Sequence, residues 1–151
     1  MKMEEKMKEM SMKKMNESME KKELVVLWLD NKREPEVWLG KKLPSATHRH
    51  TLAFLNEKIY PLYTPRFVWV KNMREFQEYV LSHDLPGLVC FDHDLQQHPG
   101  DGEPNGRVVA QWLKEYCKER GLTLPMCWVQ SGNPTGAPRI RRLLGLEEPQ
   151  D

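Results

Sequence analysis

Apolar residues in this chain fall into four short runs that are separated by longer polar or mixed segments. The runs are LVVLWLD at 24–30, RFVWV at 66–70, LVCFD at 88–92 and MCWVQ at 126–130. Near-continuous apolar runs of this length are typical of strands that are buried on both faces of a parallel sheet. We therefore expect a sheet of about four strands.

Segments with helical signals lie between and after these runs. Asn72 has Glu75 three residues further on, which predicts a helix N-terminus with a capping box. A second helix is expected to end at Gly121, because glycine suits the residue after a helix, and a third is expected over 137–145. The segment TLAFLNEKI at 51–59 is predicted to be a short helix within a region that is otherwise rich in turn signals.

This alternation of strands and helices predicts an α/β fold, a flavodoxin-like three-layer sandwich around a mainly parallel sheet. We expect the strand order 2-1-3-4, in which the winding reverses between strands 1 and 3 and leaves a ligand crevice at their carboxyl ends. Asp30 and Asp92 end these two strands, and Ser131 follows the fourth. The three side chains should therefore lie on one rim of the sheet.

The chain divides by composition into a tail, a domain and a short end. Residues 1–23 hold seven of the nine methionines, with lysine and glutamate making up most of the rest. Pairs such as Glu4 with Lys8 favour a helix, so this tail is predicted to be flexible or helical, and it is a candidate site for a protein partner. Residues 24–146 form the predicted domain, and residues 147–151 form a C-terminal tail.

Overall charge, hydropathy and cysteine content narrow the class of protein. The chain has 23 basic and 22 acidic residues, which gives no general electrostatic case for nucleic acid or a membrane surface. Its longest apolar run is too short to cross a bilayer. Cys90 and Cys127 lie in apolar runs and are predicted to be buried thiols. The odd number of cysteines and the lack of a secretory signal indicate the cytoplasm.

Asp30 and Asp92 are the first candidates for chemistry. Two neighbouring carboxylates repel each other unless a proton or a cation lies between them, and Mg²⁺ or Mn²⁺ with bound phosphate is a common solution. His93 and Asp94 follow directly, and an imidazole beside a carboxylate suits proton transfer. The alternative is that each aspartate only caps the loop after its strand, and that His93 is a structural or surface residue.

The stretch SGNPTGAPRI at 131–140 is the second candidate. Small polar and glycine residues before a helix can hold an anion, and arginines can neutralise a phosphate. The expected phosphate-binding residues are Ser131, Gly132, Asn133, Arg139 and Arg33. The alternative is an ordinary turn between a strand and a helix, with surface arginines.

Several stretches together resemble the cyclic-phosphate processing receiver-like domain, a divergent relative of the response-regulator receiver. They are LWLDNKREP, FVWVKNMREFQEYV, LVCFDHDL, NGRVVAQWL and WVQSGNPTGAPRI, within residues 24–146. The resemblance implies a metal in an acidic pocket and activity on cyclic phosphates of nucleotides or RNA ends. It implies a metal site at Asp30 and Asp92, and catalytic roles for Asp92, His93, Asp94 and Ser131.

Three positions depart from the pattern that the resemblance implies. Asn31 stands where a second acid is usual, Gln130 where a histidine is usual, and Gly106-Arg107-Val108 where Gly-Tyr-Asp is usual. Two functions therefore stay open. The protein is a metal-dependent phosphoesterase, or it is a receiver-like module that binds a nucleotide or phosphate without turnover, or accepts a phosphoryl group on Asp92.

Overall fold

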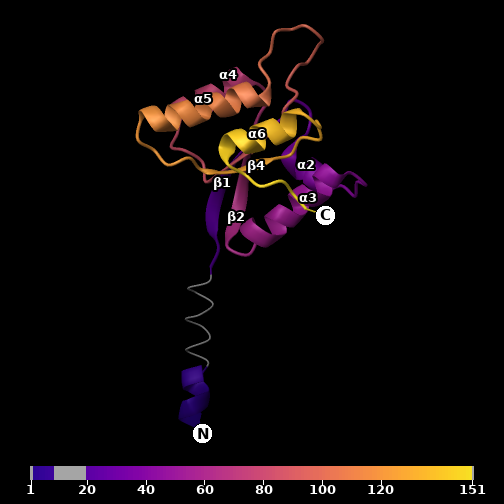
Figure 1. The fold of residues 1–151 in the computed structure, drawn as a ribbon. Coiled ribbons are helices and arrows are strands. Elements are labelled where there is room, and N and C mark those ends of the chain that lie inside the picture. Colours follow the sequence, from indigo (N-terminus) through magenta and orange to yellow (C-terminus); the bar gives the residue numbers. More distant parts are fainter. Residues whose placement is uncertain (1, 9–19, 151) are drawn as a thin grey trace.

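The computed structural model describes residues 2–8 and 20–150 (Figure 1). Four strands and six helical segments follow the first helix-like stretch at residues 2–8. The strands are β1 (Lys22–Leu29), β2 (Tyr63–Val70), β3 (Leu88–Phe91) and β4 (Met126–Val129). The helical segments are α2 (Pro35–Leu39), α3 (Ala46–Phe54), the π-helical turn η1 (Leu55–Ile59), α4 (Met73–Ser82), α5 (Gly106–Glu119) and α6 (Gly136–Leu144).

The four strands form one parallel sheet in the order β2-β1-β3-β4, which confirms the predicted fold class and strand order. In the register of the sheet, Leu29 at the end of β1 pairs with Phe91 at the end of β3. Phe91 in turn pairs with Val129 at the end of β4. Three strands therefore end at the same level, and the residues that follow them meet at one rim.

Helices cover both faces of the sheet and create two separate cores (Figure 1). On one face, α4, α5 and α6 pack over a core that includes Leu29, Phe91 and Val129. On the other face, α2, α3 and η1 pack over a core that includes Trp28 and Cys90. Successive strand residues thus alternate between the two cores, as a pleated sheet requires. This alternation decides where each side chain at the rim points.

The region between β1 and β2 differs most from the sequence prediction. The expected helix at 51–59 begins earlier, at Ala46, where the Ser45 hydroxyl accepts the backbone N–H of His48 at 3.3 Å. Its last part is a π-helical turn instead of a regular helix. His48 is buried and its Nε2 lies 2.9 Å from the carbonyl oxygen of Trp38, which ties α3 to α2.

The predicted helix ends and thiols agree with the structure. The Asn72 side chain accepts the Glu75 N–H at 2.9 Å and caps α4. Gly121 follows α5 with φ of 64°, a conformation that glycine adopts without strain. Cys90 and Cys127 are buried and free.

The methionine-rich tail is described only in part. Residues 2–8 are helical, with exposed Met3 and Met7, and the prediction for residues 9–19 lies outside the described residues. Within the described ranges, no helix has both the length and the apolar character needed to cross a membrane.

Candidate functional site

Asp30, Asp92 and Gln130 stand in a row across the rim, one residue beyond the ends of β1, β3 and β4. The backbone N–H of Asp92 donates to Leu29 O at 2.9 Å, and that of Gln130 donates to Phe91 O at 3.0 Å, so the ladder continues one step past the strands. The pleat places all three side chains on the face of α2 and α3, and all three residues are buried.

A pocket of about 440 Å³ opens at this rim. Its wall combines the loop after β1, the Asp-His-Asp segment after β3 and the loop after β4. The lining residues are Asp30, Asn31, Lys32, Arg33, Asp92, Asp94, Ser131, Gly132, Asn133 and Pro134. The structure therefore brings the two predicted metal ligands together with most of the predicted phosphate-binding residues.

Asp30 organises the loop after β1. Its Oδ1 accepts the backbone N–H groups of Lys32 at 3.0 Å and Arg33 at 2.9 Å, so the capping role holds for this atom. The indole N–H of Trp69 donates to the Asp30 carbonyl at 2.7 Å, and that of Trp28 donates to the Arg33 carbonyl at 3.0 Å. Oδ2 of Asp30 is buried and has no hydrogen-bond partner among the described residues.

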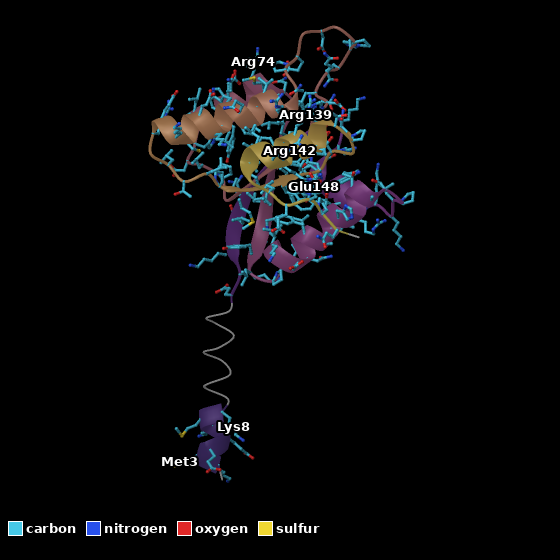
Figure 2. The ribbon with its side chains drawn as sticks, in the orientation of Figure 1. Met3, Lys8, Arg74, Arg139, Arg142 and Glu148 are labelled. Carbon is cyan, nitrogen blue, oxygen red and sulfur yellow. The ribbon has the colours of Figure 1, made fainter. Side chains whose placement is uncertain are left out.

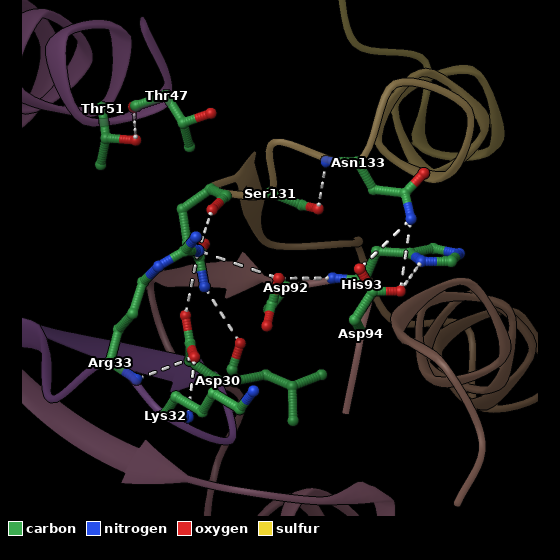
Figure 3. Close-up of polar contacts among 12 residues, drawn as sticks. Asp30, Lys32, Arg33, Thr47, Thr51, Asp92, His93, Asp94, Ser131 and Asn133 are labelled. Carbon is green, nitrogen blue, oxygen red and sulfur yellow. Dashed lines mark hydrogen bonds and ion pairs between the residues drawn. The ribbon is translucent and has the colours of Figure 1, made fainter. Parts of the chain in front are cut away.

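Arg33 places its guanidinium between the two carboxylates (Figure 3). Nη1 lies 3.5 Å from Asp30 Oδ2 and 3.9 Å from Asp92 Oδ1, and it donates to the Gln130 carbonyl at 2.7 Å. The guanidinium also lies over the Trp38 ring, 5.2 Å from its centroid. A positive charge from the chain itself therefore lies close to both carboxylates that the sequence predicts as metal ligands.

The carboxylates in this row are held in an unfavourable environment. Burial, together with the charge of Asp30, raises the pKa of Asp92 to about 7, although the positive charge of Arg33 opposes this shift. Burial also raises the pKa of Asp30, although hydrogen bonds from the backbone N–H groups of Arg33 and Lys32 act to lower it. Arg33 thus compensates only part of the cost of placing two carboxylates in a buried row.

His93 points to the opposite face of the sheet, because it follows Asp92 directly in the pleat. Its ring lies against the start of α6, where a Cβ on Gly136 would come within 2.3 Å of the ring. Nδ1 of His93 is 2.8 Å from Asp94 Oδ1. His93 does not line the pocket, so its predicted role in proton transfer reaches the pocket only through Asp94.

Asp94 connects His93 to the loop after β4. The Asn133 amide donates to both oxygens of Asp94, at 3.3 and 3.2 Å (Figure 3). Although partial burial opposes the shift, hydrogen bonds from His93 and Asn133 lower the pKa of Asp94. Oδ1 of Asn133 accepts the N–H groups of Thr135 and Gly136, which a bound anion at the start of α6 would otherwise use.

We call Asp30, Arg33, Asp92 and Gln130 the Asp30 side of the rim, and His93, Asp94 and Asn133 the His93 side. A close backbone contact joins them. Gly106 N–H donates to the His93 carbonyl at 2.8 Å, and a Cβ at Gly106 would lie 1.7 Å from the Asp92 carbonyl oxygen. Only glycine permits α5 to begin this close to the Asp92-His93 backbone.

The remaining predicted residues divide between the pocket and the surface. Ser131 is buried in the pocket wall, where its hydroxyl accepts the Asn133 N–H at 3.1 Å. Gly132 is exposed and lines the pocket. Arg139 is exposed on α6 (Figure 2) and is not among the residues that line the pocket. The structure therefore brings Ser131, Gly132 and Arg33 to the pocket but not Arg139.

Three residues at the site have roles that the sequence prediction missed. Gln130 lies in one row with Asp30 and Asp92. This position follows from the register of β3 and β4, which end at the same level. Lys32 lines the pocket and adds a positive charge beside Arg33. Asn31 donates from Nδ2 to the Gln96 carbonyl at 2.9 Å, which fastens the loop after β3 to the loop after β1. An aspartate at position 31 cannot make this hydrogen bond.

A comparison with models of known protein families identifies the family of this chain. The model of the cyclic-phosphate processing receiver domain matches residues 25–145, which include the whole sheet from Val25 and every residue of the pocket. The chain belongs to this family. Its receiver-like fold is therefore associated with cyclic-phosphate processing, as the sequence resemblance implied. No curated protein and no solved structure matches the chain significantly.

Proposed function

We propose that the pocket binds a cyclic phosphate ester, such as that of a nucleotide or an RNA end, and opens it to a phosphomonoester. The observation that supports this most is the pair of buried carboxylates, in which Asp30 Oδ2 makes no hydrogen bond, in a pocket that also holds Lys32 and Arg33. The family of cyclic-phosphate processing receiver domains supports the class of substrate.

The residues present fit a hard divalent cation. Asp30 Oδ2 is a buried oxygen without a donor, and Asp92 follows β3 at the adjacent position in the row. Among the described residues, no group of three or more histidine, cysteine, aspartate or glutamate side chains could hold a metal, so the chain would supply two carboxylates. Mg²⁺ binds in this way, with water and substrate phosphate completing its shell. Bound at Asp30 and Asp92, Mg²⁺ or Mn²⁺ would supply charge that polarises the phosphoryl group.

The chain's own residues position the substrate. Arg33 can bind two phosphate oxygens at once, and Lys32 adds a second positive charge at the mouth of the pocket. Gly132 exposes backbone at the opposite wall, and the Ser131 hydroxyl fixes the loop through the Asn133 N–H. These groups would stabilise the negative charge that develops on the phosphoryl oxygens.

Ring opening adds the oxygen of water to phosphorus, breaks one of the two ring P–O bonds, and delivers a water proton to the leaving alkoxide. We assign the handling of that proton to Asp94, because its side chain is exposed and lines the pocket. His93 then acts as a positioning residue, holding Asp94 Oδ1 through Nδ1. This assignment moves the proton-transfer role from His93 to its carboxylate partner.

Hydrolysis of 2′,3′-cyclic nucleotides with and without Mg²⁺ or Mn²⁺ tests the proposal. We expect turnover by the wild-type chain and loss of at least about a hundredfold in Asp92→Asn, because the variant loses one of the two carboxylates that would hold the divalent ion at the reacting phosphate. Asp84→Asn is the matched control, since Asp84 is exposed and precedes the opposite end of β3. Tight nucleotide binding without turnover would instead favour the non-catalytic module, and a stable phosphoryl adduct absent from Asp92→Asn would favour phosphoryl acceptance.

A further inference from the structure

The guanidinium of Arg33 is the positively charged group that lies close to both buried carboxylates. Its Nη1 lies 3.5 Å from Asp30 Oδ2 and 3.9 Å from Asp92 Oδ1. A divalent ion bound by the same two carboxylates would need the same space. The guanidinium and the ion therefore exclude each other unless one of them moves.

The guanidinium satisfies the hydrogen-bonding groups around this space only in part. Nη1 makes its hydrogen bond to the Gln130 carbonyl, while both contacts to carboxylates exceed the usual hydrogen-bond range. Two buried acceptors in the row, Asp30 Oδ2 and Gln130 Oε1, have no donor in the described part of the chain. Buried acceptors without hydrogen bonds are costly, so the Asp30 carboxylate can accept a cation more fully than through its 3.5 Å ion pair with Arg33.

The Arg33 side chain can turn without moving its backbone, at the cost of the 2.7 Å hydrogen bond from Nη1 to the Gln130 carbonyl. Asp30 Oδ1 holds the Arg33 N–H, and the Trp28 indole holds the Arg33 carbonyl, which fixes the loop. The side chain itself is 34% exposed and its guanidinium stacks on Trp38. A change of rotamer can therefore carry the charge from the carboxylates to the mouth of the pocket.

We infer that Arg33 and a divalent cation are alternative occupants of the space between Asp30 and Asp92, so that ion binding turns the guanidinium toward incoming phosphate. The inference rests on the proposed metal site. In the absence of the ion, Arg33 closes the carboxylate pair; with the ion bound, the same residue becomes a phosphate ligand. Ion and phosphate then bind cooperatively, because the first releases the group that binds the second.

Titration with Mn²⁺, followed by the paramagnetic resonance signal of the free ion, tests the exclusion in the full chain. We expect Arg33→Met to bind Mn²⁺ at least about tenfold more tightly than the wild type, since a positive charge within 4 Å of the ligands is removed. The matched control is Lys32→Met, which removes a neighbouring charge of the same pocket and should change affinity by less than about threefold. Asp30→Asn should abolish binding.

Equal shifts in Arg33→Met and Lys32→Met would overturn the inference, because a general loss of positive charge would then explain both. Failure of wild type and Arg33→Met alike to bind Mn²⁺ would overturn it too. The first result leaves the proposed hydrolysis in place, whereas the second also removes the divalent ion from it; hydrolysis itself is measured separately. Conversely, tighter Mn²⁺ binding by Arg33→Met in a chain without hydrolytic activity would support the exclusion and remove the proposed function.

Tryptophan fluorescence of the wild type provides a second measurement that does not depend on the folding of an Arg33 variant. Release of the guanidinium from the Trp38 ring should change the emission when Mg²⁺ is added, and Trp38→Phe should lose this change. An emission that stays constant at a Mg²⁺ concentration that displaces Mn²⁺ would show that Arg33 does not move.

Discussion

The two sides of the rim are built from neighbouring residues but differ in how completely their polar groups are paired. On the His93 side, His93 Nδ1 meets Asp94, and both Asp94 oxygens accept from Asn133. On the Asp30 side, two carboxylates share one guanidinium at 3.5 and 3.9 Å, and Asp30 Oδ2 has no donor in the described residues. The polar groups of the His93 side are therefore largely satisfied, whereas the Asp30 side, where we propose that a ligand binds, has a buried oxygen without a hydrogen bond.

The physical origin of this difference is the pleat of β3. Asp92 and His93 are consecutive, so one faces α2 and α3 while the other faces α5 and α6. On the α6 face, Gly136 and Asn133 accommodate the imidazole and its carboxylate partner. On the α2 face, only Arg33 approaches closely enough to form an ion pair with the buried carboxylates among the described residues.

The largest effect is expected from Gly106→Ala, which breaks the junction between the two sides. The new Cβ would overlap the Asp92 carbonyl oxygen, which belongs to backbone and cannot turn away. We expect a loss on the order of 3 kcal/mol or more in the free energy of unfolding, measured by urea denaturation. Gly40→Ala is the control, because its nearest contact would be 3.3 Å at ordinary φ. A loss no greater than that of Gly40→Ala would show that α5 can shift at its first residue.

The sheet and its rim were predictable because they depend on long apolar runs and on the polar residues that end them. Asp30 and Asp92 could be assigned to one crevice from strand order alone. The position of Arg33 could not, because it depends on the path of a short loop that Asp30 and two tryptophan indoles fix. The side chains of Asp92 and His93 point to opposite faces of the sheet because side chains alternate along a strand. This alternation continues beyond Phe91 because the backbone hydrogen bonds between the strands also continue.

A smaller but still large effect is expected in the pH dependence of stability, which reports the protonation of the buried carboxylates on the Asp30 side. The folded-state pKa of Asp92 is raised to about 7, above that of an unfolded aspartate. The folded chain therefore holds a proton that the unfolded chain loses, and the free energy of unfolding falls as pH rises from about 4 to about 7. The size of this fall is on the order of a few kcal/mol.

Urea denaturation of the wild type and Asp92→Asn, both with a chelator, checks this expectation. The amide cannot ionise, so the variant should gain stability relative to the wild type as pH rises through this range. Asp30 contributes in the same direction, because burial raises its pKa as well. Parallel pH curves for the two proteins would mean that Arg33 neutralises the pair more completely than its distances imply.

A pair of substitutions at His93 tests the paired side with a smaller expected effect. The amide nitrogen of asparagine can take the place of Nδ1, which faces Asp94, whereas that of glutamine corresponds to Nε2. If His93 only positions Asp94, His93→Asn should keep kcat/KM for a cyclic nucleotide within about threefold, and His93→Gln should lose about tenfold, the equivalent of one hydrogen bond. The pH profile of His93→Asn should keep the wild-type shape. Equal and severe losses in both variants would return the proton-transfer role to His93 itself.

The smallest effect is expected from Asn31→Asp, which sharpens the contrast by adding a carboxylate to the unpaired side. Loss of the Nδ2 donor to the Gln96 carbonyl should lower the free energy of unfolding by about 1 kcal/mol in chelator. The added charge lines the same pocket and should tighten Mn²⁺ binding a few-fold, so that Mn²⁺ restores the lost stability by mass action. Asn56→Asp, at an exposed position of η1, is the control for added charge. If Mn²⁺ stabilises Asn31→Asp no more than Asn56→Asp, the oxygen at position 31 does not reach the ion, and this chain uses the residue only to hold the two loops together.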